Sequence, residues 1–419
     1  MTRTVRTRLA VGAGRATGWL SRVTGRGQGA TISGRVMNLI APDLLTHLAE
    51  GNRVTLVSAT NGKTTTTRFL AAAVAASGRP LVTNSTGANL TSGIAPTLAS
   101  ATAPGDAILE VDERVLPRVV DPLAARLLVF GNLSRDQLDR YGEVRAVGDA
   151  WRKVTTDHPG IAVIANASDP HVVWAAQPAA VTWVALGLGW RQDAATCPSC
   201  GALLHWDDVR FDCPTASGGC GFAQPDATHH LDGDALVLDV GTADERRVPL
   251  ALALPGRWNL ANAALAVSAA VHLGVDPVDA AAAAGSVTSV AGRYMRVPLD
   301  DGRSARVLLA KNPAGWSEVL HHLAVTGSPV VIAVNARVAD GKDPSWLWDV
   351  PYELLRDCPT AAAGDRCLDV AVRLKYADVE HVVEPDALAA ARALPGDDVH
   401  IVASYTQFSS LYRKFGDEK

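Results

Sequence analysis

One short segment restricts the fold of this chain more than any other. Residues 58–66 read SATNGKTTT; they follow a β-rich run at 53–58 and lead into an Ala- and Leu-rich run at 64–76. Backbone N–H groups at the start of a helix, aided by the helix dipole, bind anions. In such a loop a lysine reaches the outer phosphates of a nucleotide, and the hydroxyl that follows it ligates Mg²⁺. We therefore predict a nucleotide site formed by Thr60, Asn61, Gly62, Lys63, Thr64 and Thr65.

The same alternation of β-rich and helical runs continues along the chain. It predicts βαβ units, and hence an α/β fold with a parallel sheet flanked by helices. The pattern breaks at 191–230, which looks like an insert, and a second alternating region begins near Ala305. A boundary is predicted at the polar run Asp300–Arg303. The expected division is a basic N-terminal segment (1–40), a central ATP-binding domain (41–298) and a smaller α/β C-terminal domain (299–419).

Charge is distributed unevenly along the 419 residues. The net charge of -4 provides no electrostatic reason to expect a nucleic-acid partner, yet the first 35 residues contain seven arginines and no acid. Arginines and glycines interrupt every apolar run there, so neither an export signal nor a membrane-spanning helix is expected. We expect a cytoplasmic protein. The basic start is either an arm that contacts anionic lipid at the inner face of the membrane or a solvated surface helix.

Four of the six cysteines lie within 24 residues. In a cytoplasmic protein such crowding favours a metal site over disulfides, and four thiolates would close a structural Zn²⁺ site with no open position. Free thiols are the alternative, because the second pair is separated by six residues instead of the usual two. The predicted zinc ligands are Cys197, Cys200, Cys213 and Cys220.

Segment 58–66 also resembles the phosphate loop of Mur ligases and folylpolyglutamate synthases. Blocks at 109–113 (LEVDE), 132–141 (NLSRDQLDRY) and 256–264 (GRWNLANAA) follow in the order of that family. By this resemblance Glu110 is a catalytic Mg²⁺ ligand together with Thr64, and Lys63 is catalytic. Asn259 reads the adenine edge, and Arg293 reaches the nucleotide from the domain junction.

Two positions near these blocks leave details of the metal chemistry open. Gln137 stands where the family has a His that helps to hold a second metal, so the number of Mg²⁺ ions stays undecided. Lys153 lies near the position of a carbamylated lysine in several Mur ligases. An ordinary surface lysine is the alternative.

Three features are similar to the MurT group of Mur ligases: the cysteine insert, the segment at 311–316 (KNPAGW) and the segment at 340–350 (DGKDPSWLWDV). This resemblance implies a zinc-ribbon insert in a P-loop domain and a heterodimer with a GatD-type glutaminase. The implied reaction is ATP-dependent amidation of the α-carboxylate of D-Glu in lipid II, through an acyl phosphate. Asp349 would orient a histidine of the glutaminase; a solvent-facing turn acid is the alternative.

Three other functions fit these features less well. An amino-acid-adding ligase similar to folylpolyglutamate synthase would need neither the insert nor the two C-terminal segments. A non-catalytic nucleotide-binding scaffold would not require Lys63, Thr64 and Glu110 together. A zinc ribbon that binds nucleic acid would be expected to carry more basic residues than this insert does.

Overall fold

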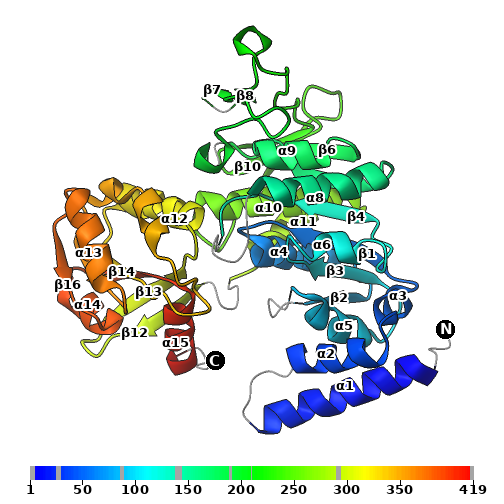
Figure 1. Cartoon of the computed structure of the whole chain (residues 1–419), viewed down its shortest axis with the longest axis horizontal. Coiled ribbons are helices and arrows are strands. Elements are labelled where there is room, and N and C mark those ends of the chain that lie inside the picture. Colours follow the sequence, from blue (N-terminus) through cyan, green and yellow to red (C-terminus); the bar gives the residue numbers. More distant parts are fainter. Residues whose placement is uncertain are drawn as a thin grey trace. The chain divides into compact units, whose positions relative to one another are not determined.

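A computed structural model describes residues 5–24, 30–84, 89–136, 144–187, 191–208, 210–288 and 294–415. The chain forms two compact units, one comprising Met1–Ser134 and Val144–Thr288 and the other Arg135–Glu143 and Ser289–Lys419. Strands alternate with helices in both units (Figure 1), which confirms the predicted α/β class.

The first unit contains a nine-stranded sheet in the order β11-β10-β9-β6-β5-β4-β1-β3-β2. Within this order, all neighbouring strands from β9 to β2 are parallel, namely β9, β6, β5, β4, β1, β3 and β2. The pairs β9–β10 and β10–β11 are antiparallel. The strands are β1 (Arg53–Ser58), β2 (Leu81–Thr83), β3 (Asp106–Glu110), β4 (Leu127–Phe130), β5 (Ala162–Asn166), β6 (Ala180–Ala185), β9 (His229–Asp232), β10 (Ala235–Leu238) and β11 (Arg246–Pro249).

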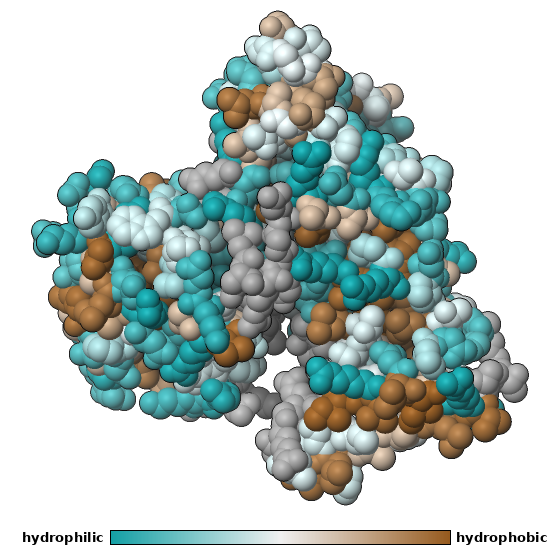
Figure 2. Space-filling model, viewed as in Figure 1, coloured by the Kyte–Doolittle hydropathy of each residue, from teal (hydrophilic) through white to brown (hydrophobic). Residues whose placement is uncertain are grey.

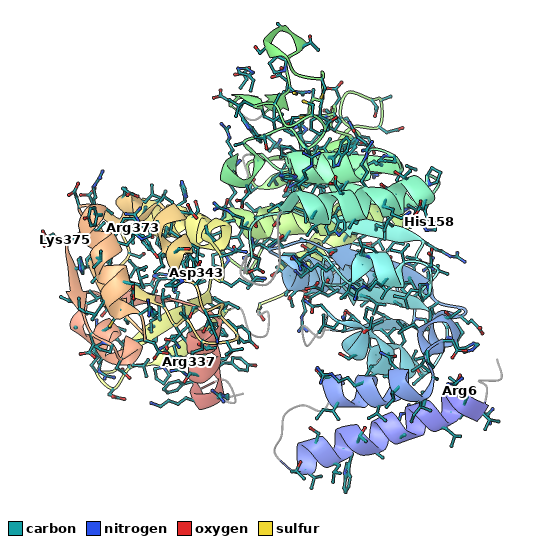
Figure 3. All side chains as sticks on the ribbon, in the orientation of Figure 1. Arg6, His158, Arg337, Asp343, Arg373 and Lys375 are labelled. Atoms are coloured by element: carbon teal, nitrogen blue, oxygen red, sulfur yellow. The ribbon has the colours of Figure 1, made fainter. Side chains whose placement is uncertain are left out.

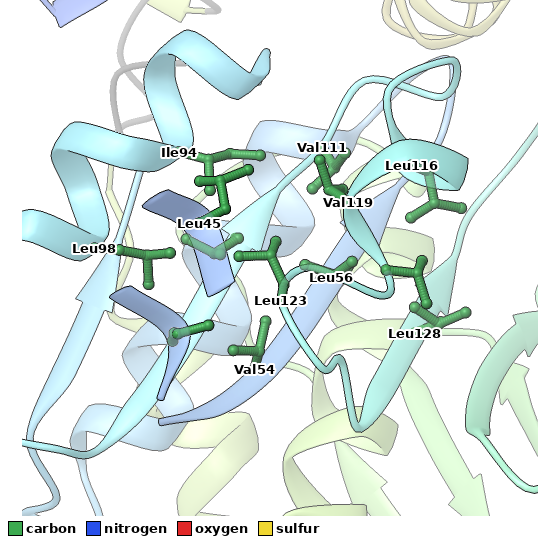
Figure 4. Close-up of a cluster of buried hydrophobic side chains, with 14 of the residues drawn as sticks. Leu45, Val54, Leu56, Ile94, Leu98, Val111, Leu116, Val119, Leu123 and Leu128 are labelled. Atoms are coloured by element: carbon green, nitrogen blue, oxygen red, sulfur yellow. The ribbon is translucent and has the colours of Figure 1, made fainter. Parts of the chain in front are cut away.

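Helices pack against this sheet. The helix after β1, α4 (Lys63–Ala75), packs against α10 (Arg257–His272) and α11 (Pro277–Gly285). A large buried cluster joins residues of β1 and β4, such as Leu56 and Leu128, to Leu45 of α3 (Leu44–Ala49) and Ile94 of α5 (Thr91–Ala99) (Figure 4). The remaining helices after α5 are α6 (Leu116–Val119), α8 (Val144–Asp157) and α9 (Pro170–Ala176).

The basic N-terminal segment is folded onto this unit. It forms α1 (Val5–Val23) and α2 (Ala30–Ile40); α1 packs against α2, and α2 packs against α5. Within the part of the chain that the structure describes, none of the helices combines the length and the apolar character needed to cross a bilayer.

The predicted insert lies between β6 and β9. It contains the short turns η1 (Arg191–Ala194) and η2 (Thr215–Ser217) and an antiparallel pair, β7 (His205–Asp207) and β8 (Arg210–Asp212). A separate small apolar cluster, in which Phe211 and Phe222 contact Val173 of α9, fastens the insert to the unit.

The second unit is a six-stranded sheet in the order β12-β13-β17-β14-β15-β16. Its strands are β12 (Tyr294–Pro298), β13 (Ser304–Leu309), β14 (Val330–Ala333), β15 (Thr360–Ala363), β16 (His381–Val383) and β17 (Asp398–Ala403). Its helical segments are α12 (Pro313–Thr326), η3 (Ser345–Asp349), η4 (Tyr352–Leu355), α13 (Cys367–Tyr376), α14 (Ala387–Ala393) and α15 (Tyr405–Phe415).

The division between the units differs from the predicted boundary. β12 and β13 pair antiparallel, so the polar run Asp300–Arg303 is a hairpin turn within the C-terminal sheet and not a linker. The first unit ends at Thr288, whereas the sequence predicted an end at 298.

Candidate nucleotide and metal sites

The phosphate loop lies at the carboxyl end of β1, between its parallel neighbours β3 and β4. Open α/β sheets place ligands at this edge. Gly62 caps α4 with a φ of 81°, a left-handed conformation, and a Cβ there would lie 2.2 Å from Oδ1 of Asn262. Glycine is therefore required both by the backbone angle and by the space available.

The loop is held in place by the segment that follows β4. The Thr60 N–H donates to the carbonyl oxygen of Asn132 over 2.7 Å, and the Asn61 N–H donates to its Oδ1 over 3.0 Å. The Ser134 N–H donates to Oγ1 of Thr60 over 3.1 Å. These bonds organise the anion site within the protein itself, so little ordering of the loop is left for ligand binding.

Lys63 is buried at the start of α4. Its Nζ donates to the carbonyl oxygens of Ala59 and Thr60 and lies 2.8 Å from Oε2 of Glu113. Burial lowers the pKa of Lys63, but the carboxylates of Glu113 and Glu110 raise it by more, so the net shift is upward and the side chain is a cation. Trp151 holds Glu113 by donating from Nε1 to its backbone oxygen over 2.8 Å.

Glu110 ends β3 beside the loop and is 1% exposed. Asn84 exchanges two hydrogen bonds of 2.8 Å with its backbone, and Asn89 donates to its Oε1 over 3.3 Å. Its Oε2 is buried and has no hydrogen-bond partner among the described residues. A buried carboxylate oxygen beside a phosphate loop matches the oxygen ligands that Mg²⁺ prefers, and Thr64 lies at the start of the same α4 helix.

Helix α10 brings the third predicted block to the phosphate loop. Asn262 is within 3.2 Å of Oγ1 of Thr66, next to Gly62, and Asn259 lies one turn earlier. Asn259 is buried, and its Nδ2 donates to the carbonyl oxygen of Pro255 over 2.7 Å. Arg293, predicted to reach the nucleotide, lies outside the described residues, as does Gln137.

Asp349 lies in the C-terminal unit at the end of η3. Its carboxylate is 3.1 Å from the Arg135 guanidinium, and the two side chains are 35% and 30% exposed. The segment after it is anchored by Arg373 of α13 (Figure 3), which donates to the Val350 carbonyl oxygen over 2.9 Å. The carboxylate is thus accessible while the backbone that carries it is held.

The four clustered cysteines converge, as a shared metal requires. Their sulfur atoms all lie within 4.8 Å of one another; Cys197 and Cys220 are 3.7 Å apart, and Cys200 and Cys213 are 3.5 Å apart. Four sulfurs about 2.3 Å from a tetrahedral Zn²⁺ would be separated by about 3.8 Å. The donor set therefore fits a closed zinc site.

The long spacing of the second cysteine pair is taken up locally. The 3₁₀ turn Thr215–Ser217 fills the extra length, and the Cys220 N–H donates to Sγ of Cys213 over 3.4 Å. A hydrogen bond from the Phe222 backbone lowers the pKa of Cys220 to about 7, whereas burial raises the pKa of Cys197 to about 12, so a metal would have to displace the proton of Cys197 on binding.

Some residues of the site were not predicted. Asn84 and Asn89 contact Glu110 from the neighbouring segment of the sheet edge, and Trp151 orients Glu113. Asn262 lies in the block 256–264, for which the sequence predicts a role of Asn259 only. Lys153 is an exposed lysine paired with the aspartate one turn later.

Comparison with known proteins places these features in a family. The family model of the Mur ligase middle domain matches residues 57–270, and that of the MurT ligase C-terminal domain matches residues 309–408. The chain is 30% identical over 385 residues to the lipid II isoglutaminyl synthase (glutamine-hydrolyzing) subunit MurT of Staphylococcus aureus, covering 86% of this chain and 85% of that one. The Streptococcus pneumoniae MurT subunit is 29% identical, with 96% and 95% covered.

A solved structure supports the fold. A pseudomurein peptide ligase type C from Methanothermus fervidus superposes with a TM-score of 0.67 at 18% identity, covering 89% of this chain and 80% of that one. At this identity the likeness establishes the fold alone, and it confirms the predicted Mur ligase type of architecture.

Proposed function

This chain is a ligase of the MurT family, with a Mur ligase-type role in peptidoglycan synthesis, and we propose that it amidates the α-carboxylate of D-Glu in the lipid II stem peptide. The product would be D-isoglutamine. The MurT subunits of S. aureus and S. pneumoniae carry the name of this activity, and the chain is similar to them over most of its length.

The reaction would proceed in two steps. A carboxylate oxygen attacks the γ-phosphorus of ATP and the bond from that phosphorus to the bridging oxygen breaks, so ADP leaves and an acyl phosphate forms. Ammonia then attacks the acyl carbon and inorganic phosphate leaves, while the released proton passes to phosphate or water. Activation is needed because a free carboxylate resists attack by an amine.

The residues around the phosphate loop suit the first step. Lys63 is a buried cation that would offset charge on the transferred phosphoryl group, the main task of phosphoryl transfer. Glu110 and Thr64 would hold Mg²⁺, which when bound reduces the repulsion between the carboxylate and the phosphates. In this proposal Thr60, Asn61, Gly62 and Thr65 line the phosphates, Asn259 reads the adenine, and Arg293 contacts the nucleotide.

The observation that carries the proposal is the buried Oε2 of Glu110, which has no hydrogen-bond partner among the described residues. A buried carboxylate oxygen without a hydrogen bond destabilises the folded protein. Such an atom is explained where a ligand or a metal ion binds to it. A scaffold that only binds nucleotide would not need it. This favours a ligase over the non-catalytic alternative.

A glutaminase subunit would supply the ammonia. The S. aureus and S. pneumoniae relatives are described as the MurT subunit of a glutamine-hydrolysing synthase, so a partner subunit is implied. We assign Asp349 to this contact because its carboxylate is partly exposed on an anchored segment. A Cys–His pair normally needs a carboxylate that orients the histidine, and Asp349 would provide it. The zinc site, by contrast, would be structural.

The proposal is tested by mass spectrometry of lipid II incubated with the protein, ATP, Mg²⁺ and ammonium, and in parallel with a GatD-type glutaminase and glutamine. One carboxylate should become a carboxamide, and Lys63→Ala should abolish this while the exposed-lysine control Lys153→Ala preserves it. Asp349→Asn should lose only the glutamine-dependent reaction. Addition of a whole amino acid to the lipid, or ATP hydrolysis without any change in lipid II, would refute amidation.

A further inference from the structure

Helix α1 has most of its small side chains inside and, apart from Val11, its large apolar ones outside. The face packed on the protein consists of buried residues, all of them small or medium-sized: Thr7, Ala10, Val11, Gly14, Gly18 and Ser21. At Gly14 the approach is so close that a Cβ would lie 2.4 Å from Cγ of Met37 in α2. A helix of an ordinary globular domain turns its large apolar side chains toward the core instead.

Five of the six large apolar residues of α1 form an outward stripe, with the smaller Gly12 and Ala16 between its two ends. The five are Val5, Leu9, Trp19, Leu20 and Val23, which are 75%, 64%, 59%, 55% and 63% exposed. At about 100° per residue, all five fall within an arc of about 100° on the side opposite the buried face. Figure 2 shows hydrophobic surface along the N-terminal helices beside hydrophilic surface.

Arginines border this stripe. Arg8 and Arg15 lie on one side of it and Arg6, labelled in Figure 3, on the other; all three residues are exposed. Arg6 and Arg15 each donate one hydrogen bond to the protein, to the carbonyl oxygens of Ile40 and Ala99, and keep further N–H groups for a ligand. No acidic residue precedes Asp43 in the sequence. The outward face of α1 is therefore apolar along its centre and positive along its edges.

We propose that the outward face of α1 binds peripherally to a membrane that contains anionic lipid. The apolar stripe would enter the boundary between headgroups and acyl chains. Trp19 would lie at the depth of the lipid headgroups, where tryptophan is enriched in membrane proteins, and the arginines would contact lipid phosphates. The helix would lie on the membrane without crossing it. An exposed apolar stripe of this length marks an interaction site, and its positive edges identify an anionic partner.

A second copy of this chain fits the face less well. Pairing two α1 helices through the stripe would bring two sets of arginines together with no acid on either helix to offset them. Like charges brought together in this way oppose association. The inference goes beyond the proposed amidation, and vesicle binding tests it without ATP or lipid II, so the two proposals can fail separately.

The test is co-sedimentation of the full chain with vesicles of phosphatidylglycerol mixed with phosphatidylcholine, and with vesicles of phosphatidylcholine alone. Binding should require the anionic lipid and weaken with salt. Replacing Leu9, Trp19 and Leu20 together by serine should lower the partition coefficient at least tenfold. Val325→Ser with Leu368→Ser, at even more exposed apolar positions in the C-terminal unit, is the control and should bind as the unmodified chain does.

A second variant separates charge from apolar contact. Arg8→Glu should reduce binding by about fivefold or more, because each arginine near an anionic surface contributes about 1 kcal/mol. Hydrogen exchange of residues 5–24 should slow when anionic vesicles are added. The proposal is overturned if both lipid mixtures bind equally or not at all. It is equally overturned if the triple serine variant converts a dimer of this chain to monomers in analytical ultracentrifugation.

Discussion

Replacing Gly62 by alanine probes the geometry on which the phosphate loop depends. The residue has a φ of 81°, which costs a non-glycine residue about 1–2 kcal/mol. The new methyl group would also lie 2.2 Å from Oδ1 of Asn262 and 2.9 Å from its Cγ, so this side chain must move. Moving it breaks the contact with Oγ1 of Thr66, a buried hydrogen bond whose loss costs about 1–3 kcal/mol.

Gly62→Ala should therefore lower the free energy of opening of β1 and α4 by about 2–5 kcal/mol. The assay is hydrogen-exchange mass spectrometry of peptides from these two elements in increasing urea, because a protein of two units need not unfold in one transition. ATP affinity should fall in the same variant, since the N–H groups of the loop no longer converge.

A double-mutant cycle with Asn262→Ala separates the two contributions. Without the Asn262 side chain the methyl group has room, and the hydrogen bond to Thr66 is already absent. Gly62→Ala should then cost only the backbone strain, about 1–2 kcal/mol, leaving a coupling energy of about 1–3 kcal/mol. An equal cost in both backgrounds would refute the steric argument, and no cost in either would refute the left-handed conformation itself.

Three further predictions concern other parts of the molecule. Glu110→Gln should lower ATP turnover by about a hundredfold or more while zinc content stays unchanged; near-normal turnover would exclude Glu110 as a metal ligand. Cys220→Ser, or a chelator, should release zinc and the exchange protection of β7 and β8 but spare α4, because the insert has its own apolar cluster; zinc retained by the variant would contradict this. Burial lowers the pKa of His400 on β17, so the unfolded state binds its proton more readily and the stability of the C-terminal unit should fall as pH drops below about 6.5. His400→Gln should flatten this dependence, and an unchanged pH profile would show that another group is responsible.

Local signals predicted the elements around the phosphate loop closely. β1 spans Arg53–Ser58 as expected, and α4 begins one residue before the expected start at Thr64. Both follow from short-range physics: the strand is rich in apolar and β-branched residues, and a glycine precedes the first turn of the helix. The cysteine cluster was also predictable, since its pairs are close in sequence.

Features that depend on pairing between distant segments were not predictable in the same way. Asp300–Arg303 is polar, as a linker would be, and only the antiparallel pairing of β12 with β13 identifies it as a hairpin turn. The contacts of Asn84 and Asn89 with Glu110 depend on which strand lies beside β3. The burial of α1 was likewise undetermined, because its apolar residues alone do not reveal which face meets α2.

The ion pair at Asp349 involves the same carboxylate as the proposed contact with the glutaminase. Arg135, which belongs to the same unit, pairs with Asp349. If Asp349 orients a histidine of the partner, Arg135 competes with that histidine for one carboxylate.

The free energy of the Arg135–Asp349 ion pair, which sets the strength of this competition, depends on how exposed the two side chains are. Both side chains are about one third exposed, and ion pairs in such positions contribute about 0–1 kcal/mol. Arg135→Ala should therefore tighten binding of a GatD-type glutaminase by up to about fivefold in calorimetry, with Arg135→Lys, which keeps the charge, closer to the unmodified chain. In the Asp349→Asn background the same substitution should have no effect. A weaker complex in Arg135→Ala would instead mean that the arginine itself contacts the partner or holds Asp349 in its working position.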